Sequence, residues 1–299
     1  MDYRTLAARA ARTALPVLLV ASASAQQGST VLFGDANPDY LDLPQQRRAV
    51  APITSPFYHE DSFVTSDVRA WFLRHDFPTN VLGGYATAYA VQVRLALTES
   101  LQFVAYKDGY LDFNDDAVQD DGIVDLAAGL KWAFLQNWET DTHVAVGVGY
   151  ELGIGDEEVL QDDDEVRIWT SFNKGFDRLH LGATANYTFG VGSEDDLGDS
   201  DRLFLHGHLD YWVNEFFSPV VELNYYDTVS EGDNRPLPVH GADVANLGGG
   251  GSEDTLTAGF GCEFRPATAF GLRAAYETPL NSSTDLFGYR WTFSATWSF

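Results

Sequence analysis

The chain has 299 residues, of which 45% are apolar and 21% charged, and its formal net charge is −26 because 44 acidic residues outnumber 18 basic ones. This acidity excludes nucleic acid as a partner, because phosphate backbones bind basic surfaces. The single cysteine, Cys262, excludes an intramolecular disulfide and a cysteine-based metal cluster. The composition is that of a folded chain, and the length suits one all-β domain.

The first 25 residues have the three parts of a secretory signal peptide. Arginines come first, a short apolar run follows at 14–21, and Ala23-Ser-Ala25 provides the small residues of a cleavage site. The apolar run is too short to span a membrane as a helix. We therefore expect residues 1–25 to be removed after export across the inner membrane.

Residues 26–61 form an irregular segment, which we call the leader. Four prolines, at positions 38, 44, 52 and 56, interrupt any regular pattern in it. Two interpretations stay open. The leader is either a loose periplasmic tail or a plug that folds into the domain formed by residues 62–299.

From residue 62 to the C-terminus, apolar side chains recur at every second position. The runs 144–152 and 270–276 are examples. Side chains alternate between the two faces of a strand, so each run predicts a strand with one apolar face. About twelve such runs can be counted, with ten or fourteen as alternatives.

The last run, 288–299, has the clearest alternation. Tyr289, Trp291, Phe293 and Trp297 fall on one face, polar residues fall on the other, and the run ends at Phe299. This pattern resembles the closing strand of Gram-negative outer-membrane β-barrels, whose terminal aromatic residue is read by the barrel assembly machinery. The resemblance implies that the protein is located in the outer membrane.

The connections between the runs alternate in length. Short ones, such as 98–100, alternate with mostly longer, acidic ones, such as 108–122, 153–164 and 228–253. Outer-membrane barrels have short periplasmic turns and longer extracellular loops. The sequence therefore predicts an all-β fold, a closed antiparallel transmembrane β-barrel of about twelve strands. Both ends of the chain would face the periplasm, and outer-membrane lipid and lipopolysaccharide would surround the barrel.

The other positions of the same runs carry small or polar residues. An Arg or Lys that faces lipid at mid-depth costs roughly 2–4 kcal/mol, so charged side chains belong on the lumen side. Acids and bases are mixed there, and they either pair and fill a closed lumen or line a wet channel. The lumen-lining candidates are Asp67, Arg69, Gln92, Arg94, Asp125, Lys131, Glu151, Arg167, His180, His206, His208, Asp210, Glu222, Asn224, Glu263, Arg273, Glu277 and Arg290.

Two histidines and a carboxylate on one strand raise the question of a metal site. His206, His208 and Asp210 share one face, but alternate residues of a strand lie roughly 7 Å apart, too far for easy joint ligation. We therefore favour hydrogen bonding to neighbours such as Arg202 or Asn186. The sequence predicts neither a metal nor a cofactor.

The sequence does not predict an enzyme. A phospholipase would need a serine on the lipid-facing side as partner for His180, His206 or His208, and the alternation places none there. A protease would need paired Asp and His at the outer rim, where His240 and the acidic loops lie. An outer-membrane hydrolase stays a minor alternative.

The long loops carry much of the excess acid. Their spacing matches no calcium-binding motif, so a solvated acidic rim is the favoured interpretation. Since a mouth of one sign attracts the opposite charge, an open pore would prefer cations or neutral solutes to anions. The rim carboxylates are Asp115, Asp116, Asp156, Glu157, Glu158, Asp162, Asp163, Asp164, Glu194, Asp195 and Asp196.

Three phrases, at 97–110, 125–134 and 219–225, resemble strand and turn phrases of proteobacterial outer-membrane barrels. Within that class, residues 62–299 are similar to the transporter family linked to phenol degradation by the meta-cleavage pathway. The resemblance implies uptake of small aromatic or hydrophobic compounds, and it carries over no site residue. The predicted function is a passive channel for small solutes. The alternative is a structural or surface-interaction barrel with a closed lumen.

Deletion of Phe299 is expected to lower the yield of folded barrel, because the assembly signal is lost. Export to the periplasm should not change, because the signal peptide is untouched. Heat-modifiable mobility on gels measures the barrel, and periplasmic fractionation measures export. A normal barrel yield would contradict the interpretation of the closing strand.

Overall fold

The computed structural model describes residues 30–37, 39, 42–79, 83–114, 120–155, 164–191, 201–230, 254–281 and 287–299. The predicted signal peptide lies outside these ranges. No helix within them has the length and apolar character needed to cross a membrane.

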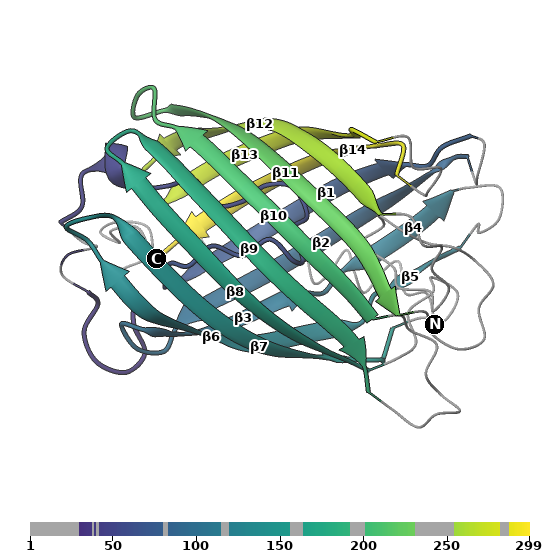
Figure 1. Ribbon diagram of the computed structural model, residues 1–299, viewed down its shortest axis with the longest axis horizontal. Helices are drawn as coiled ribbons and strands as arrows, with labels where there is room; N and C mark the ends of the chain where they lie inside the picture. The colour runs from purple at the N-terminus through teal and green to yellow at the C-terminus, as the bar shows by residue number, and fades with distance from the viewer. Residues whose placement is uncertain are drawn as a thin grey trace, which may run out of the picture.

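Within the described ranges, one short 3-10 helix precedes an array of strands (Figure 1). The elements are η1 (Gln45–Arg47), β1 (Asp67–Asp76), β2 (Tyr85–Ala96), β3 (Leu101–Lys107), β4 (Tyr110–Asn114), β5 (Asp121–Ile123), β6 (Leu126–Asn137), β7 (Thr142–Leu152), β8 (Glu165–Phe176), β9 (Leu179–Gly190), β10 (Asp201–Tyr211), β11 (Phe217–Ser230), β12 (Thr255–Ala267), β13 (Phe270–Pro279) and β14 (Tyr289–Ser298).

Twelve strands form a closed antiparallel wall, and β4 and β5 extend it. Each wall strand pairs with its neighbours, and β1 pairs with both β14 and β2, which closes the barrel. Closure leaves no unpaired edge, the condition for a sheet to cross lipid. The predicted fold class is therefore confirmed.

The two extra strands arise where a wall strand is interrupted. β3 and then β4 pair with successive parts of β2, and Asp108 and Gly109 lie between them. Gly109 has φ of +129°, and a Cβ there would lie 2.2 Å from the Tyr89 carbonyl oxygen, so this break requires glycine. The Val91 N–H donates to Asp108 Oδ1 at 3.0 Å and is thereby satisfied.

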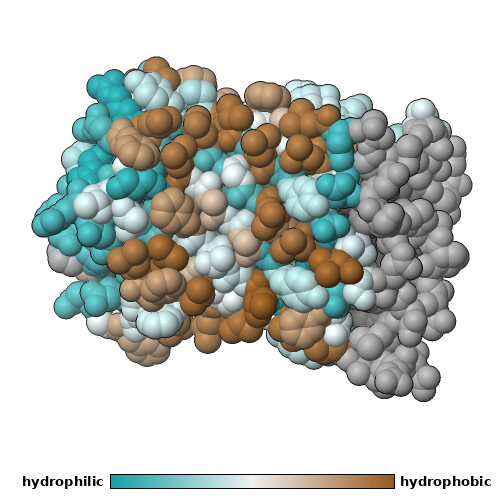
Figure 2. Space-filling model, viewed as in Figure 1, coloured by the Kyte–Doolittle hydropathy of each residue, from teal (hydrophilic) through white to brown (hydrophobic). Residues whose placement is uncertain are grey.

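The outer face of the wall is apolar. Leu130, Val148, Ile168 and Leu223 are between 45% and 53% exposed near the middle of their strands, and Figure 2 shows apolar residues across the described middle of the molecule. Aromatic side chains gather toward both ends of the strands, as the interfaces of a lipid bilayer favour. Those at one end include Tyr110, Tyr150 and Tyr289, and those at the other include Phe176, Tyr211, Phe217 and Phe264.

The two ends of the barrel differ in their connections. β1 begins and β14 ends at the short-turn end, where tight turns such as 138–141 and 177–178 join the strands. Asp141 and Asp177 have positive φ in these turns, a conformation that Asp tolerates better than most residues. At the opposite, long-loop end, connections such as 153–164 and 231–254 are longer.

The inner face differs from the prediction, because it is not only small and polar. Trp71, Phe204 and Tyr226 point inward and are at most 6% exposed. They are buried because the leader brings apolar residues of its own into the barrel, among them Ile53, Phe57 and Tyr58. The hydrophobic core of this protein therefore lies inside the lumen.

Cysteine labelling tests which end faces the outside. We expect an impermeant maleimide to label Asp120→Cys, at the long-loop end, in intact cells. Glu99→Cys, in the turn between β2 and β3, should react only after the outer membrane is permeabilised, because short turns face the periplasm. Both variants carry Cys262→Ser as background. The reverse pattern of labelling would contradict the topology.

Candidate functional site in the barrel lumen

All eighteen predicted lumen-lining residues are buried, and each is 5% exposed or less. Most have a partner within the barrel. Asp125 is turned toward the long-loop end, where its Oδ1 accepts hydrogen bonds from Ile154 N–H at 3.0 Å and Gly155 N–H at 2.7 Å. The lining of a solute pathway by this set stays a prediction.

The described part of the leader enters the barrel at the short-turn end and returns to the same end. Near the entrance, Arg47 Nε donates to Asp141 Oδ2 at 2.7 Å. Deep inside, the chain reverses at Ser55, which has φ of 51°, and the Ser55 carbonyl oxygen accepts from the N–H groups of Tyr58 and His59. We call residues 48–55 the entering limb and residues 57–61 the returning limb.

The entering limb donates its backbone N–H groups to carboxylates of β10 and β11. Val50 N–H donates to Asp210 Oδ2 at 3.0 Å. Ile53 N–H donates to Glu222 Oε1 at 2.9 Å, and Thr54 N–H donates to Glu222 Oε2 at 2.6 Å. One wall carboxylate thus satisfies two N–H groups of a segment that has no secondary structure of its own.

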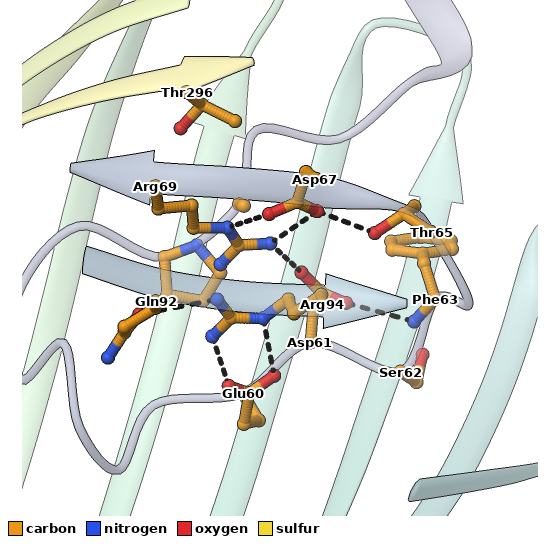
Figure 3. A network of polar contacts seen from close by, with 12 residues as sticks. Glu60, Asp61, Ser62, Phe63, Thr65, Asp67, Arg69, Gln92, Arg94 and Thr296 are labelled. Carbon is orange, nitrogen blue, oxygen red and sulfur yellow. Dashed lines mark hydrogen bonds and ion pairs between the residues drawn. The ribbon is translucent and has the colours of Figure 1, made fainter. Parts of the chain in front are cut away.

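The returning limb places two carboxylates against basic side chains of the wall (Figure 3). Glu60 forms a buried ion pair with Arg94 and lies 3.6 Å from Lys131 Nζ. Asp61 Oδ1 lies 3.3 Å from Lys131 Nζ, and its Oδ2 lies 3.7 Å from Arg69 Nη2. We call Arg69, Arg94 and Lys131 the cation cluster.

A fourth base of the wall binds the returning limb through its backbone. Arg167 donates to the carbonyl oxygens of Phe57 at 2.8 Å and Tyr58 at 2.7 Å, and to Asn186 Oδ1 at 2.9 Å. Its guanidinium lies 4.6 Å from the Tyr106 ring centroid, within the range of a cation–π contact. Arg167 is therefore held by neutral groups of the leader and the wall.

The charge state of Glu60 follows from these contacts. Burial by itself raises the pKa of Glu60, but Arg94 and Lys131 outweigh it and lower the pKa to about 2. A lowered carboxyl pKa contributes stability that is complete above the ordinary value near 4.5 and is lost as the pH falls toward 2. Mild acid therefore does not release this contact.

The histidines form hydrogen bonds rather than a metal cluster. His208 lies between Asp210 Oδ2 at 3.1 Å and Glu222 Oε1 at 2.7 Å, and His180 Nδ1 lies 2.7 Å from Asp210 Oδ1. No group of three His, Cys, Asp or Glu side chains among the described residues could hold a metal ion.

The expected partners of His206 were wrong. His206 hydrogen-bonds to Asn224 Oδ1 at 2.8 Å, and its ring stacks on that of His59 with 4.8 Å between the centroids. It therefore bonds across to β11 and contacts the leader, rather than Arg202 or Asn186. Burial lowers the pKa of His59 to about 4, so the stacked ring of the leader is neutral near pH 7.

Other charges are neutralised within the wall itself. Arg290 Nη2 pairs with Glu277 Oε2 at 2.7 Å, and Arg69 Nε pairs with Asp67 Oδ1 at 2.7 Å. Arg273 lies 3.4 Å from Glu263. These pairs need no leader.

The predicted lumen-lining set lacks several buried charged residues, among them Lys107, Glu60 and Asp61. Lys107 forms an ion pair with Glu151. Strict alternation would turn Lys107 outward, but the register shifts by one residue after Ala105, which turns its side chain into the lumen. Glu60 and Asp61 belong to a segment without periodicity, so no pattern marked them. Their one signal is a position directly before the first strand.

Little free space remains at the short-turn end. A cavity of about 50 Å³ lies between the leader and the wall, lined by residues that include Arg48, Asp67, Arg69 and Arg273. This volume accommodates a few water molecules. It does not accommodate an organic solute.

Arg290→Gln should lower the free energy of unfolding by about 3–5 kcal/mol, because it leaves the buried Glu277 carboxylate without its cation. Arg74→Gln is the matched control. Its pair with Asp76 is partly exposed, so the loss should be about 1 kcal/mol or less. Urea unfolding of the folded barrel in detergent micelles measures both variants, and equal losses would contradict the stabilising role of the buried Arg290–Glu277 pair.

The chain matches known structures in fold but matches no family. No family model and no curated protein matches the sequence. The chain is similar to the crystal structure of an outer-membrane channel from Pseudomonas putida F1, with a TM-score of 0.61 and 10% identity over 84% of this chain and 100% of that one. It is also similar to the KdgM porin in complex with disordered oligogalacturonate, with a TM-score of 0.49 and 9% identity over 78% of this chain and 99% of that one. The first likeness shows the fold alone, a β-barrel, and the resemblance to phenol-pathway transporters stays a prediction.

Proposed function

We propose that this protein is an outer-membrane channel for small solutes and that its leader constricts the lumen from the periplasmic side. The observation that carries the proposal is that charged side chains of the wall have their bonding partners in the leader. Arg94, Lys131 and Glu222 bond to the leader rather than only to one another across the barrel. A removable segment therefore fills space that the wall by itself leaves polar.

The fold supports this function. An apolar outer face suits lipid, and a wall lined by buried charges suits a water-filled interior once the leader moves. The Pseudomonas putida F1 protein, which shares the barrel architecture, is described as an outer-membrane channel. Location in the outer membrane, a cleaved signal peptide, and contact with lipopolysaccharide and the assembly machinery belong to the same proposal.

The main alternative is a structural or surface-interaction barrel with a permanently closed lumen. In that case the leader would be a fixed part of the core, and no solute would pass. A hydrolase is disfavoured, because His180, His206 and His208 are buried in the lumen, each bonded to an acid or amide. Uptake of small aromatic compounds follows only from the resemblance stated above.

A reversible lock on the leader separates the channel from the closed barrel. Thr54 and Asn224 are in contact, with Asn224 Nδ2 donating to Thr54 Oγ1 at 2.9 Å. We expect a disulfide between Thr54→Cys and Asn224→Cys, in a Cys262→Ser background, to abolish openings in planar bilayers. Reduction should restore them, and deletion of residues 45–61 should give a several-fold larger conductance.

Two controls complete the design. Each single cysteine variant should conduct alike before and after reduction. A leader-deleted protein that is folded, as shown by heat-modifiable mobility, and yet does not conduct would overturn the channel function in favour of the closed barrel.

A further inference from the structure

Within the described residues, every carboxylate that pairs with Arg94 or Lys131 belongs to the leader. Arg94 pairs with Glu60, and its remaining side-chain partner is the neutral Gln92 at 3.2 Å. Lys131 pairs with Glu60 and Asp61. Arg69 differs, because Asp67 of the wall also neutralises it. Two buried cations thus depend on a segment that is not part of the wall.

The geometry of the contact is that of anion recognition. One carboxylate, Glu60, faces Arg94 with both oxygens, Oε2 lying 3.4 Å from Nε and Oε1 pairing with Nη2. A two-oxygen contact between a carboxylate and a guanidinium is directional and strong. The second carboxylate, Asp61, bridges Lys131 and Arg69. Figure 3 shows Glu60 lying against Arg94 and Asp61 lying against Arg69.

Displacement of the leader would remove the carboxylates that pair with Arg94 and Lys131. Arg94 and Lys131 are 1% and 0% exposed, and a buried charge without a counter-ion is strongly unfavourable. Water reaches the site when the leader leaves, and so does any anion in the lumen. A solute that supplies two carboxylates restores what Glu60 and Asp61 provided.

We propose that Glu60 and Asp61 occupy an anion-binding site of the solute pathway, and that small organic dicarboxylates bind Arg94 and Lys131 in their place and thereby displace the leader. The inference rests on the proposed channel function and names its substrate class. By linkage, a ligand that binds only the displaced state shifts the population toward that state. The solute therefore opens its own pathway.

Acid is not the opening signal at this contact. The lowered pKa of Glu60 keeps the carboxylate charged until the pH approaches 2. Competition by another anion leaves the wall charges neutralised throughout, whereas protonation of Glu60 would leave Arg94 without its counter-ion.

The test follows the reactivity of a cysteine at the tip of the leader. Thr54 is fully buried, so Thr54→Cys in a Cys262→Ser background reacts with a soluble maleimide only when the leader moves. The probe is succinate, at constant ionic strength, on the folded barrel in detergent. We expect succinate to accelerate labelling about fivefold or more. Acetate and uncharged succinamide should have little effect.

Three pairs of charge substitutions in the same background test whether the cation cluster is the site of the succinate effect. Arg94→Gln with Lys131→Gln should abolish the acceleration by succinate. The matched control, Arg74→Gln with Lys174→Gln, removes two positive charges outside the lumen and should keep it. Glu60→Gln with Asp61→Asn should label fast without succinate, and its reversal potential in a KCl gradient should shift toward anions.

Several outcomes would overturn the inference. Equal acceleration in the variant without Arg94 and Lys131 would show that these residues are not the binding site. If acetate accelerated labelling as much as succinate, the ligand class would not be dicarboxylates. If the leader-deleted barrel conducts but succinate does not change the labelling of Thr54→Cys in the full-length protein, the channel function survives and this inference fails. If the leader-deleted barrel does not conduct, the channel function fails, and labelling still reports on the anion site.

Discussion

The structure depends on neutralising charge inside a narrow barrel. Strands that cross lipid must turn their charged residues inward, and an unpaired charge there is far more unfavourable than in water. The wall meets this constraint by itself at Arg290 and Glu277, which lie 2.7 Å apart. It does not do so at Arg94 and Lys131, whose carboxylate partners come from the leader. The leader is therefore an electrostatic component of the barrel as well as a filler of space.

The two limbs of the leader match the two sides of the lumen. Backbone N–H groups of the entering limb point at acids of β10 and β11, such as Glu222. Carboxylates and carbonyls of the returning limb meet bases of β1, β2, β6 and β8, such as Arg94 and Arg167. A rotated leader would set carboxylates against acids and N–H groups against bases. This complementarity gives the leader one orientation although it has almost no secondary structure.

Most of the barrel could be predicted from the sequence, because a strand in lipid has few options. All eighteen residues that alternation assigned to the inner face are buried, and alternation misassigned Lys107, where the chain breaks register. Inward aromatic residues such as Phe204 were not predicted, since their partners lie in the leader. Contacts of the leader with the wall join residues up to 222 positions apart, as between Ala51 and Arg273, and no local pattern encodes such pairs.

The predicted acidic rim and the cation cluster would act at different depths of the proposed pathway. Asp164 is the one predicted rim carboxylate within the described residues, and the others lie outside them. The effect of such charges on ions is screened beyond a Debye length of about 10 Å at 0.1 M salt, so in the proposed channel the rim would act at the mouth. Inside, with the leader in place, Glu60 and Asp61 cover Arg94 and Lys131, so in the proposed channel the rim would set the ion preference. With the leader displaced, bases of β2 and β6 would face acids of β10 and β11 across the lumen, and an elongated anion would be held by one side and repelled by the other. The proposed channel would then select solutes by the distribution of their charge, a property that net charge at the rim does not provide.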